Sequence, residues 1–151
     1  MSFKSEIEKA NRLIETDIVE IVQAAGVQVT RKIIKATPVG EKFGGRARNN
    51  WLSSLNVKPT AGSRRAASKN GNDAIVESTN KLLSLKLGDK FHFFNYLPYI
   101  NVLEFGRYPN PPKGGKDKTK GGFSKQAPRG MVRVNAAKWK TIVTTIVNRK
   151  R

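Results

Sequence analysis

The chain has 151 residues, of which 38% are hydrophobic, and it carries a formal net charge of +18 without a single cysteine. This length suits one domain, residues 1–151, and the lean apolar content predicts that neighbouring molecules supply part of its stability. The absence of cysteine excludes disulfides and thiolate metal sites, as expected for assembly in a reducing cytoplasm. No stretch approaches about 20 apolar residues, so we expect a soluble protein without a membrane anchor.

The positive charge is concentrated toward the C-terminus. Residues 1–37 carry six basic and five acidic side chains, residues 38–104 carry ten and five, and residues 105–151 carry thirteen and one. A basic region of this kind attracts polyanions or acidic protein surfaces, and salt weakens the association.

A long amphipathic helix is predicted at the N-terminus. It should begin at Ser5, whose spacing to Glu8 is that of a capping box, and end at residue 36 or 37, before Pro38. Its acidic side chains all lie in the first half, which is either a solvated face or a dock for a basic partner, such as the C-terminal part of a neighbouring copy. The apolar positions recur every three or four residues and are Ile7, Ala10, Ile14, Ile18, Ile21, Ala25, Val29 and Ile33.

A small antiparallel sheet is predicted in the middle of the chain. Its three strands are expected at residues 51–58, 74–79 and 90–94, with a short helix or turn at 81–87. Between the first two strands, the small, polar and basic residues 59–73 predict an exposed, mobile loop, in which Arg64 and Arg65 are candidate interface residues.

The C-terminal third is predicted to contain two helices around a basic loop. A short helix at 97–105 should have Pro98 near its first position and Gly106 as its C-cap. Residues 107–125 should be mobile until a partner orders them, and their candidate interface residues are Lys113, Lys116, Lys118, Lys120 and Lys125. Beyond Pro128 we expect a C-terminal helix, although residues 141–147 also have strong strand propensity. One face of this helix should comprise Val132, Ala136, Trp139, Val143 and Ile146. The expected fold class is α+β, with the long N-terminal helix and the C-terminal helix packed on the small sheet.

Few residues are suited to catalysis. His92 is the only histidine, and strand alternation should point it away from Phe91 and Phe93, which indicates a structural role. Glu104 lies in an apolar segment, where it is either a base or, as we favour, a buried charge paired with Arg133 or Arg46. The other carboxylates are scattered, so we expect no enzymatic activity, no cofactor and no metal site.

Three short motifs carry a family resemblance. They are Asn95-Tyr-Leu-Pro-Tyr99 with Glu104-Phe-Gly106, then Gln126-Ala-Pro-Arg-Gly-Met-Val-Arg133, and the earlier Thr37-Pro-Val-Gly40 leading to Arg46, Asn50 and Trp51. In type and order they resemble the tail-completion, or neck, proteins of tailed bacteriophages. The pattern of that family reads roughly Asn-x-Leu-Pro-Tyr, Glu-Tyr/Phe-Gly and Gln-Ala-Pro-x-Gly-Met-Val-Arg, after Thr-Pro-Val-Asp-Thr-Gly-Arg. This chain lacks the Asp-Thr pair and has a longer turn there.

The resemblance implies a structural virion protein. Such a protein assembles in the host cytoplasm into a homo-oligomeric ring, a hexamer or dodecamer, which completes the tail and joins it to the DNA-filled head. Its expected partners are a portal-side adaptor or stopper and the tail terminator or tail tube, with nonspecific contact to genomic DNA. Tyr99 and Glu104 are further candidate interface residues. The candidate framework residues are Trp51, Pro98, Gly106, Pro128, Arg133 and Trp139. The alternative is a nucleic-acid-binding protein that uses the basic C-terminal third.

Overall fold

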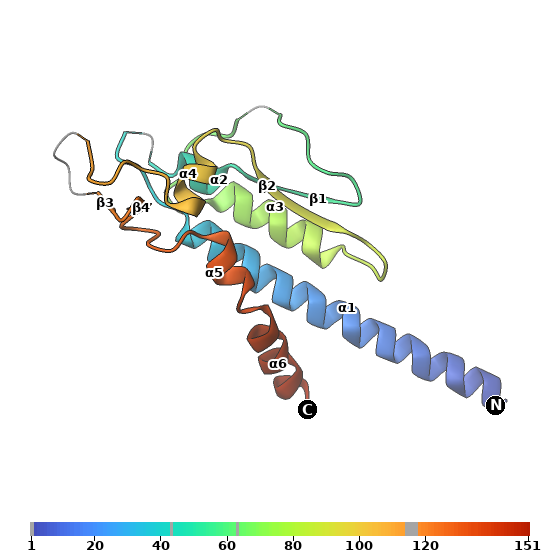
Figure 1. The fold of residues 1–151 in the computed structure, drawn as a ribbon. Coiled ribbons are helices and arrows are strands. Elements are labelled where there is room, and N and C mark those ends of the chain that lie inside the picture. The colour runs from blue at the N-terminus through green and yellow to red at the C-terminus, as the bar shows by residue number, and fades with distance from the viewer. Residues whose placement is uncertain (1, 43, 63, 114–117) are drawn as a thin grey trace.

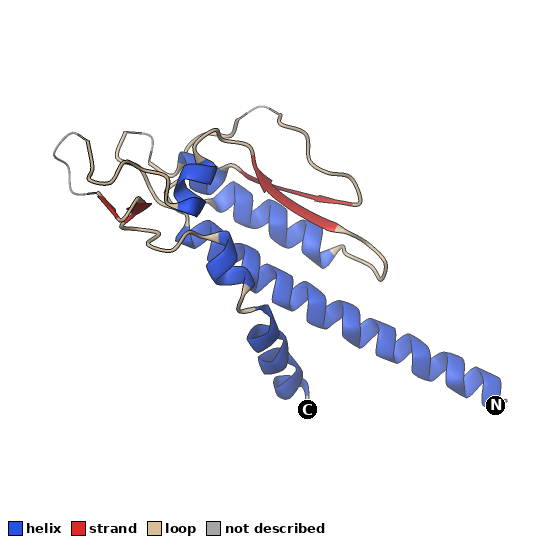
Figure 2. Ribbon diagram, in the orientation of Figure 1, coloured by secondary structure: helices blue, strands red, loops and turns tan. Residues whose placement is uncertain are grey.

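The structure is a computed structural model that describes residues 2–42, 44–62, 64–113 and 118–151. Its α+β fold is built in layers around α1 (Phe3–Ala36), as Figure 1 shows. Helix α3 (Asn72–Leu83) packs along the C-terminal half of α1 and is covered by a sheet formed by β1 (Trp51–Leu55) and β2 (Phe91–Asn95). Helix α6 (Trp139–Lys150) crosses α1 on the side away from α3 (Figures 1 and 2).

Helix α1 begins slightly earlier than its sequence predicts. Ser2 is the N-cap, because its Oγ accepts a hydrogen bond from the backbone N–H of Ser5 at 3.3 Å. The helix ends at Ala36, as predicted, and Thr37 before the proline is extended. Its buried residues all lie in the second half of the helix: Ala25, Gly26, Thr30, Ile33 and Ile34. The first half projects from the body of the molecule (Figure 1).

The main sheet has two strands instead of the predicted three. Strands β1 and β2 pair antiparallel, with Trp51 opposite Asn95. Residues 74–79, expected as a strand, belong to α3, so that prediction was wrong. The β-branched residues there favoured a strand, but Ala74, Ser78 and Leu82 recur at helical spacing and form a buried face. The helix start is fixed by Asn49, whose Oδ1 accepts from the N–H of residue 73 at 3.0 Å.

The segment after β2 forms α4 (Ile100–Phe105), which is shorter than predicted. Pro98 lies in the turn before this helix and not in its first turn. Gly106 ends the helix in the left-handed conformation, with φ of 65°, as predicted. A Cβ at this position would lie 2.3 Å from the ring of Phe123, so both the backbone angle and the close approach require glycine.

Two short strands and two helices complete the chain. Strands β3 (Thr119–Lys120) and β4 (Phe123–Ser124) form a small hairpin, and α5 (Val132–Ala136) is separated from α6 by a break at residues 137 and 138. The prediction that residues 132–146 form one helix with a single apolar face is therefore wrong. The break changes the helical register, so that Ile142 and Ile146 are buried while Trp139 is 40% exposed.

The main core joins the C-terminal part of α1 to α3, α4, the start of α5 and both strands of the main sheet. Its buried residues are Ile33, Ile34, Ala47, Trp51, Ala74, Leu97, Leu103, Ala127 and Met131. A second, smaller cluster lies where α6 crosses α1. The short helix α2 (Arg46–Asn49) contributes Ala47 to the main core. Within the described ranges, no helix has the length and apolar character needed to cross a membrane.

Candidate interaction surface

The three motifs meet in one framework. Val39 and Gln126 exchange two hydrogen bonds: the Val39 N–H donates to Gln126 Oε1 at 2.8 Å, and Gln126 Nε2 donates to the Val39 carbonyl at 3.0 Å. Asn95 Nδ2 donates to the carbonyl of Ala47 at 2.8 Å. Segments separated by up to 87 positions are therefore held together by residues that carry the family resemblance.

Trp51 anchors the first motif to the sheet. Its indole Nε1 donates to Thr37 Oγ1 at 2.9 Å, and Thr37 Oγ1 in turn donates to the carbonyl of Ile33 at 2.8 Å. The indole ring stacks on Phe93 with 4.8 Å between centroids. The buried indole N–H and the buried Thr37 hydroxyl therefore both have hydrogen-bond partners. This position agrees with the framework role predicted for Trp51.

The carboxylate of Glu104 joins α4 to the start of α5. It accepts hydrogen bonds from the backbone N–H groups of Met131 at 2.6 Å, Val132 at 2.9 Å and Arg133 at 3.0 Å. Arg133 Nε adds an ion pair at 3.0 Å, which confirms the predicted pairing partner. Glu104 is only 6% exposed and its carboxylate is used within the chain. The prediction that it lies at a subunit interface is therefore not supported by its burial.

Proline and glycine shape the turn that brings α5 to this carboxylate. Residues 127–130 form a turn in which the Gly130 N–H donates to the Ala127 carbonyl at 3.2 Å, and Pro128 occupies its second position. Gly130 has φ of 83°, and a Cβ there would lie 2.5 Å from the carbonyl oxygen of Glu104. This close approach aligns the backbone N–H groups with the carboxylate.

The pKa of Glu104 predicts a stability loss in acid. Burial raises this pKa, but the three backbone N–H groups and Arg133 outweigh burial and hold it below the ordinary value of 4.5. In acid, the unfolded chain therefore binds this proton before the folded chain does. The stabilisation is complete above pH 4.5 and is lost as the pH falls through the lower folded pKa. In urea unfolding, the stability difference between wild type and Glu104→Gln should shrink over that window and remain constant between pH 6 and 7.

Arg48 is a structural residue that sequence reasoning missed. Its guanidinium donates to three backbone carbonyls: Thr37 at 2.9 Å, Lys35 at 2.9 Å and Lys69 at 2.6 Å. It thereby ties the C-terminal end of α1 to the loop before α3. A basic residue after a glycine-rich turn was the available signal, but nothing in the sequence distinguishes Arg48 from Arg46.

We expect Arg48→Met to lower the free energy of unfolding by about 2 kcal/mol, since three carbonyls lose a charged donor. Urea unfolding measures this change. The exposed Arg64 provides a matched control, and Arg64→Met should change stability by less than about 0.5 kcal/mol. Equal effects of the two substitutions would contradict the role assigned to Arg48.

The loop at 59–73 is partly fixed by buried side chains. Arg65 donates to the carbonyls of Asn49 at 3.3 Å and Trp51 at 2.8 Å, and it pairs with Glu77. Asn50 Oδ1 accepts from the Arg65 N–H at 2.9 Å. The sequence predicted a mobile loop with Arg65 at an interface, whereas Arg65 is only 19% exposed and fastens the loop to the body.

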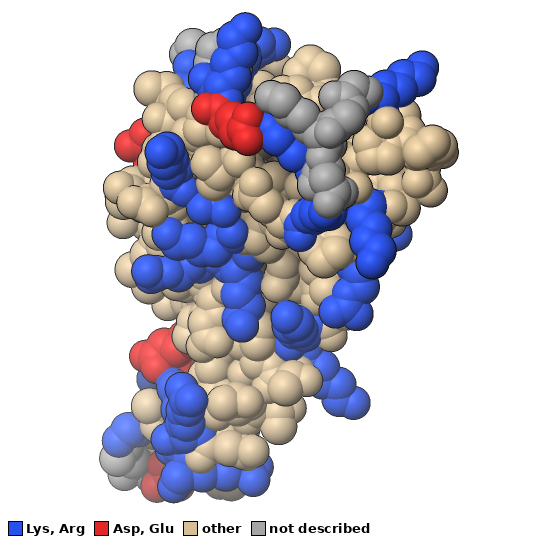
Figure 3. All heavy atoms as spheres, turned by 90° about the vertical axis from the view of Figure 1, so that its left-hand side faces the viewer, with Lys and Arg blue, Asp and Glu red and all other residues tan. Residues whose placement is uncertain are grey.

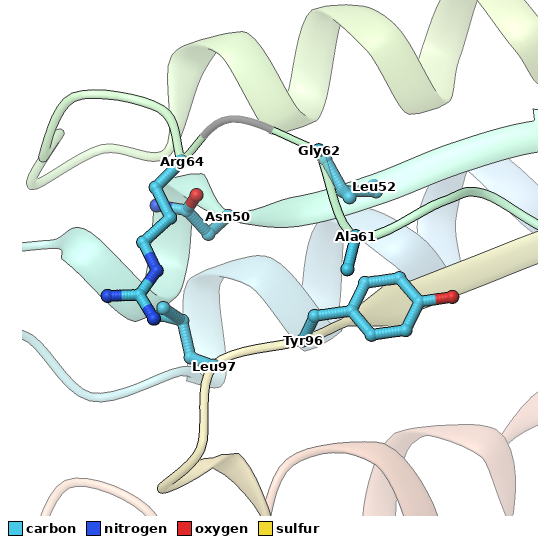
Figure 4. Close-up of a pocket in the computed structure, with 7 residues that line it drawn as sticks. All are labelled: Asn50, Leu52, Ala61, Gly62, Arg64, Tyr96 and Leu97. Atoms are coloured by element: carbon cyan, nitrogen blue, oxygen red, sulfur yellow. The ribbon is translucent and has the colours of Figure 1, made fainter.

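Arg64 borders a small cavity between this loop and the end of β2 (Figure 4). In the close-up, its side chain extends toward Leu97, and the ring of Tyr96 lies below Ala61. The cavity measures about 250 Å³. This volume is below the range of about 300–1,000 Å³ typical of small-molecule sites, so we assign it no ligand.

The molecule has one strongly basic end. Lys and Arg side chains cover much of the face shown in Figure 3, and carboxylates are few there. In Figure 1, this end is formed by the loop after α1 and by the long segment between α4 and α5. The predicted interface lysines Lys113, Lys118, Lys120 and Lys125 are all exposed on that segment, and Lys116 lies outside the described residues. Lys118 forms an exposed ion pair with Glu41 at 2.5 Å.

The described parts of segment 107–125 make hydrogen bonds within the chain. The Tyr108 N–H donates to the Gly122 carbonyl at 2.9 Å, and the Lys125 N–H donates to the Lys118 carbonyl at 3.0 Å. This differs from the prediction that order there requires a partner. The composition of the segment indicates that it cannot form a core of its own. Backbone hydrogen bonds do not depend on side-chain composition, so the composition could not predict them.

Tyr99 lies at a groove of about 550 Å³ at the basic end. The groove also contains Tyr108, Lys42, Arg46 and Lys118. Tyr99 is 37% exposed, and its place at a subunit interface stays a prediction. Burial, and secondarily the nearby Tyr99, raise the pKa of Tyr108. The Tyr108 phenol is therefore a neutral hydrogen-bonding group at physiological pH.

The predicted orientation of His92 is confirmed. Phe91 and Phe93 stack on one face of β2, at 6.2 Å between centroids, while His92 stacks with Phe94 on the other face at 6.2 Å. Among the residues that the structure describes, no three acidic or histidine side chains are grouped as metal ligands.

Comparison with models of known families, with curated proteins and with solved structures finds no match to this chain.

Proposed function

We propose that this protein is a structural component of the neck of a tailed bacteriophage. In this role it forms a homo-oligomeric ring that completes the tail and joins it to the DNA-filled head. The observation that carries the proposal is the meeting of all three resemblance motifs in one framework, through the contacts of Val39 with Gln126 and of Glu104 with the start of α5. Residues shared with the neck-protein pattern thus make contacts that hold distant segments of this fold together.

The use of the motif side chains supports a structural role over a catalytic one. The Glu104 carboxylate is occupied by three backbone N–H groups and Arg133, and the Trp51 indole is occupied by Thr37. A general base needs a reachable proton acceptor that faces a substrate. The proposal accordingly assigns these groups to the scaffold and assigns recognition to the surfaces around it.

A virus that carries a stop codon in this gene tests the proposal. We expect DNA-filled heads and free tails to accumulate unjoined in negative-stain electron micrographs, and a plasmid copy of the gene should restore joined particles. As a control, a synonymous change at the same codon should leave assembly normal. Complete infectious particles that lack the protein would exclude the neck assignment.

Nucleic-acid binding is the second candidate, and the basic face in Figure 3 is the observation that favours it. Neutralised phosphates release counterions, so nonspecific affinity for duplex DNA should fall steeply between low and physiological salt. Binding that survives an excess of competitor DNA would favour a sequence-specific DNA-binding protein. In a neck, nonspecific contact alone is compatible with passage of the genome through the ring.

A further inference from the structure

The projecting half of α1 has an uncovered apolar stripe. At about 100° per residue, Ile7, Ile14 and Ile18 share one narrow face. These three side chains are 44%, 57% and 46% exposed, and Phe3 on the same face is 78% exposed. Carboxylates flank the stripe on both sides: Glu6 and Asp17 on one, and Glu8 and Glu15 on the other. Isolated helices gain little stability without tertiary contacts, so this face is suited to a partner.

The covered part of the same stripe shows which chemistry fits it. Where α6 crosses α1, Ile142 and Ile146 pack on Ala25, with Ile21 beside them. Lys150 at the end of α6 pairs with Glu20 at 2.5 Å and with Asp17 at 3.4 Å. Apolar contact therefore covers the stripe as far as Ile21, and cation–carboxylate pairs on its flank reach Asp17. The uncovered remainder from Ile18 toward Phe3 continues the same pattern.

A groove of complementary character lies between β2, α4 and α5. It has a volume of about 260 Å³, and its walls include Ile100, Phe105 and Val132. Phe105 is 45% exposed. The guanidinium groups of Arg107 and Arg133 lie over its ring, at 5.5 and 4.6 Å from the centroid. The one carboxylate of the groove, Glu104, is already bonded within the chain.

We infer that the projecting half of α1 docks into this groove on a second copy of the chain. The apolar stripe would cover Phe105, and the flanking carboxylates would face Arg107 and the exposed side of Arg133. The inference rests on the proposed ring and specifies its subunit contact. One chain cannot make this contact with itself, because about 50 Å of helix separates the tip of α1 from the body near its C-terminal end (Figure 1).

The contact joins two different surfaces and is therefore head to tail. Repetition of such a heterologous contact gives a closed ring when the rotation between subunits closes. Pairing of two projecting helices with each other is the competing arrangement. It would bring two rows of carboxylates together at the flanks of the stripes, and like charges at close range disfavour that pairing.

Disulfide trapping tests the contact directly, because the chain has no cysteine of its own. Two single variants, Ile14→Cys on the stripe and Asn101→Cys at the groove, are mixed and oxidised. We expect a mixed dimer to form at least about tenfold faster than with Ile14→Cys and Val76→Cys, since Val76 is exposed on α3 away from the groove. Tryptic peptides of the dimer identify the linked residues.

Charge reversal provides an independent test in the full-length chain. Glu15→Arg and Arg107→Glu should each weaken self-association about tenfold or more in sedimentation velocity, and the double variant should recover most of the loss. Lys90→Glu makes the same charge change as Arg107→Glu at an exposed site outside the groove and should leave association within about twofold of wild type.

The outcomes separate this contact from the ring itself. Selective trapping of the Ile14–Asn101 pair together with recovery in the double variant supports the docking. Two outcomes overturn the docking and leave the neck proposal standing. One is rings that form without selective trapping of this pair, and the other is preferential disulfide formation between two copies of the Ile14→Cys variant. A chain that is trapped no faster than the Val76 control and stays monomeric overturns the docking, and the neck assignment then depends on the stop-codon experiment alone.

Discussion

Glu104→Ala is expected to lower the free energy of unfolding by about 3–5 kcal/mol, the range observed when one partner of a buried charged network is removed. The substitution leaves three backbone N–H groups at the start of α5 without their acceptor and leaves Arg133 without its ion pair. It also releases the junction between α4 and α5. Urea unfolding at pH 7 measures the effect.

The matched control for this prediction is Glu8→Ala, because Glu8 is exposed on the projecting half of α1. Its effect on the isolated chain should stay within about 0.5 kcal/mol. If Glu104→Ala prevents folding, Glu104→Gln retains one carbonyl acceptor and gives a measurable intermediate loss. A loss below about 1 kcal/mol for both substitutions of Glu104 would contradict its role at this junction.

Trp51→Ala is expected to have a comparable effect, also about 3–5 kcal/mol, through the cavity that it leaves in the main core. The indole is 4% exposed, stacks on Phe93 and donates to Thr37, so its removal also leaves a buried hydroxyl with one partner fewer. Thermal or urea unfolding followed by circular dichroism detects the loss.

The second tryptophan is the control. Trp139 is 40% exposed at the start of α6, and Trp139→Ala should cost less than about 1.5 kcal/mol. Trp51→Phe should fall between the two, because it keeps an aromatic ring against Phe93 and loses the hydrogen bond to Thr37. Equal losses for Trp51→Ala and Trp139→Ala would contradict the assignment of Trp51 to the core.

Local signals in the sequence predicted the fold class, the long helix and the Gly106 cap. Proline after Thr37 and glycine after α4 act on their own neighbours, so their effect can be read without tertiary structure. The Glu104–Arg133 pair was predictable for a different reason, since a carboxylate within an apolar segment requires a partner.

The missed features depend on contacts between distant segments. Residues 74–79 have strand propensity, but they form a helix whose first turn is fixed by the side chain of Asn49. This residue lies 24 positions before the backbone N–H that it binds, so propensity does not reveal the contact. Arg48 and Arg65 look like surface cations until their carbonyl acceptors are known. Trp139 is exposed because the helix is broken at residues 137 and 138, and helix propensity does not predict this break. The groove beside Phe105 likewise exists only because α4 and α5 are brought together.

The junction at Glu104 also determines how freely the basic segment can change. Because Glu104 binds the backbone at residue 131, both ends of the stretch between α4 and α5 are held at one point of the scaffold. The entropy of closing a loop grows slowly with its length, by only about 0.6 kcal/mol for each doubling. Variants with residues inserted or deleted in the exposed part of this stretch, away from Tyr108 and from residues 122–131, should therefore keep the fold. This makes it a natural site for adapting one scaffold to partners at different distances.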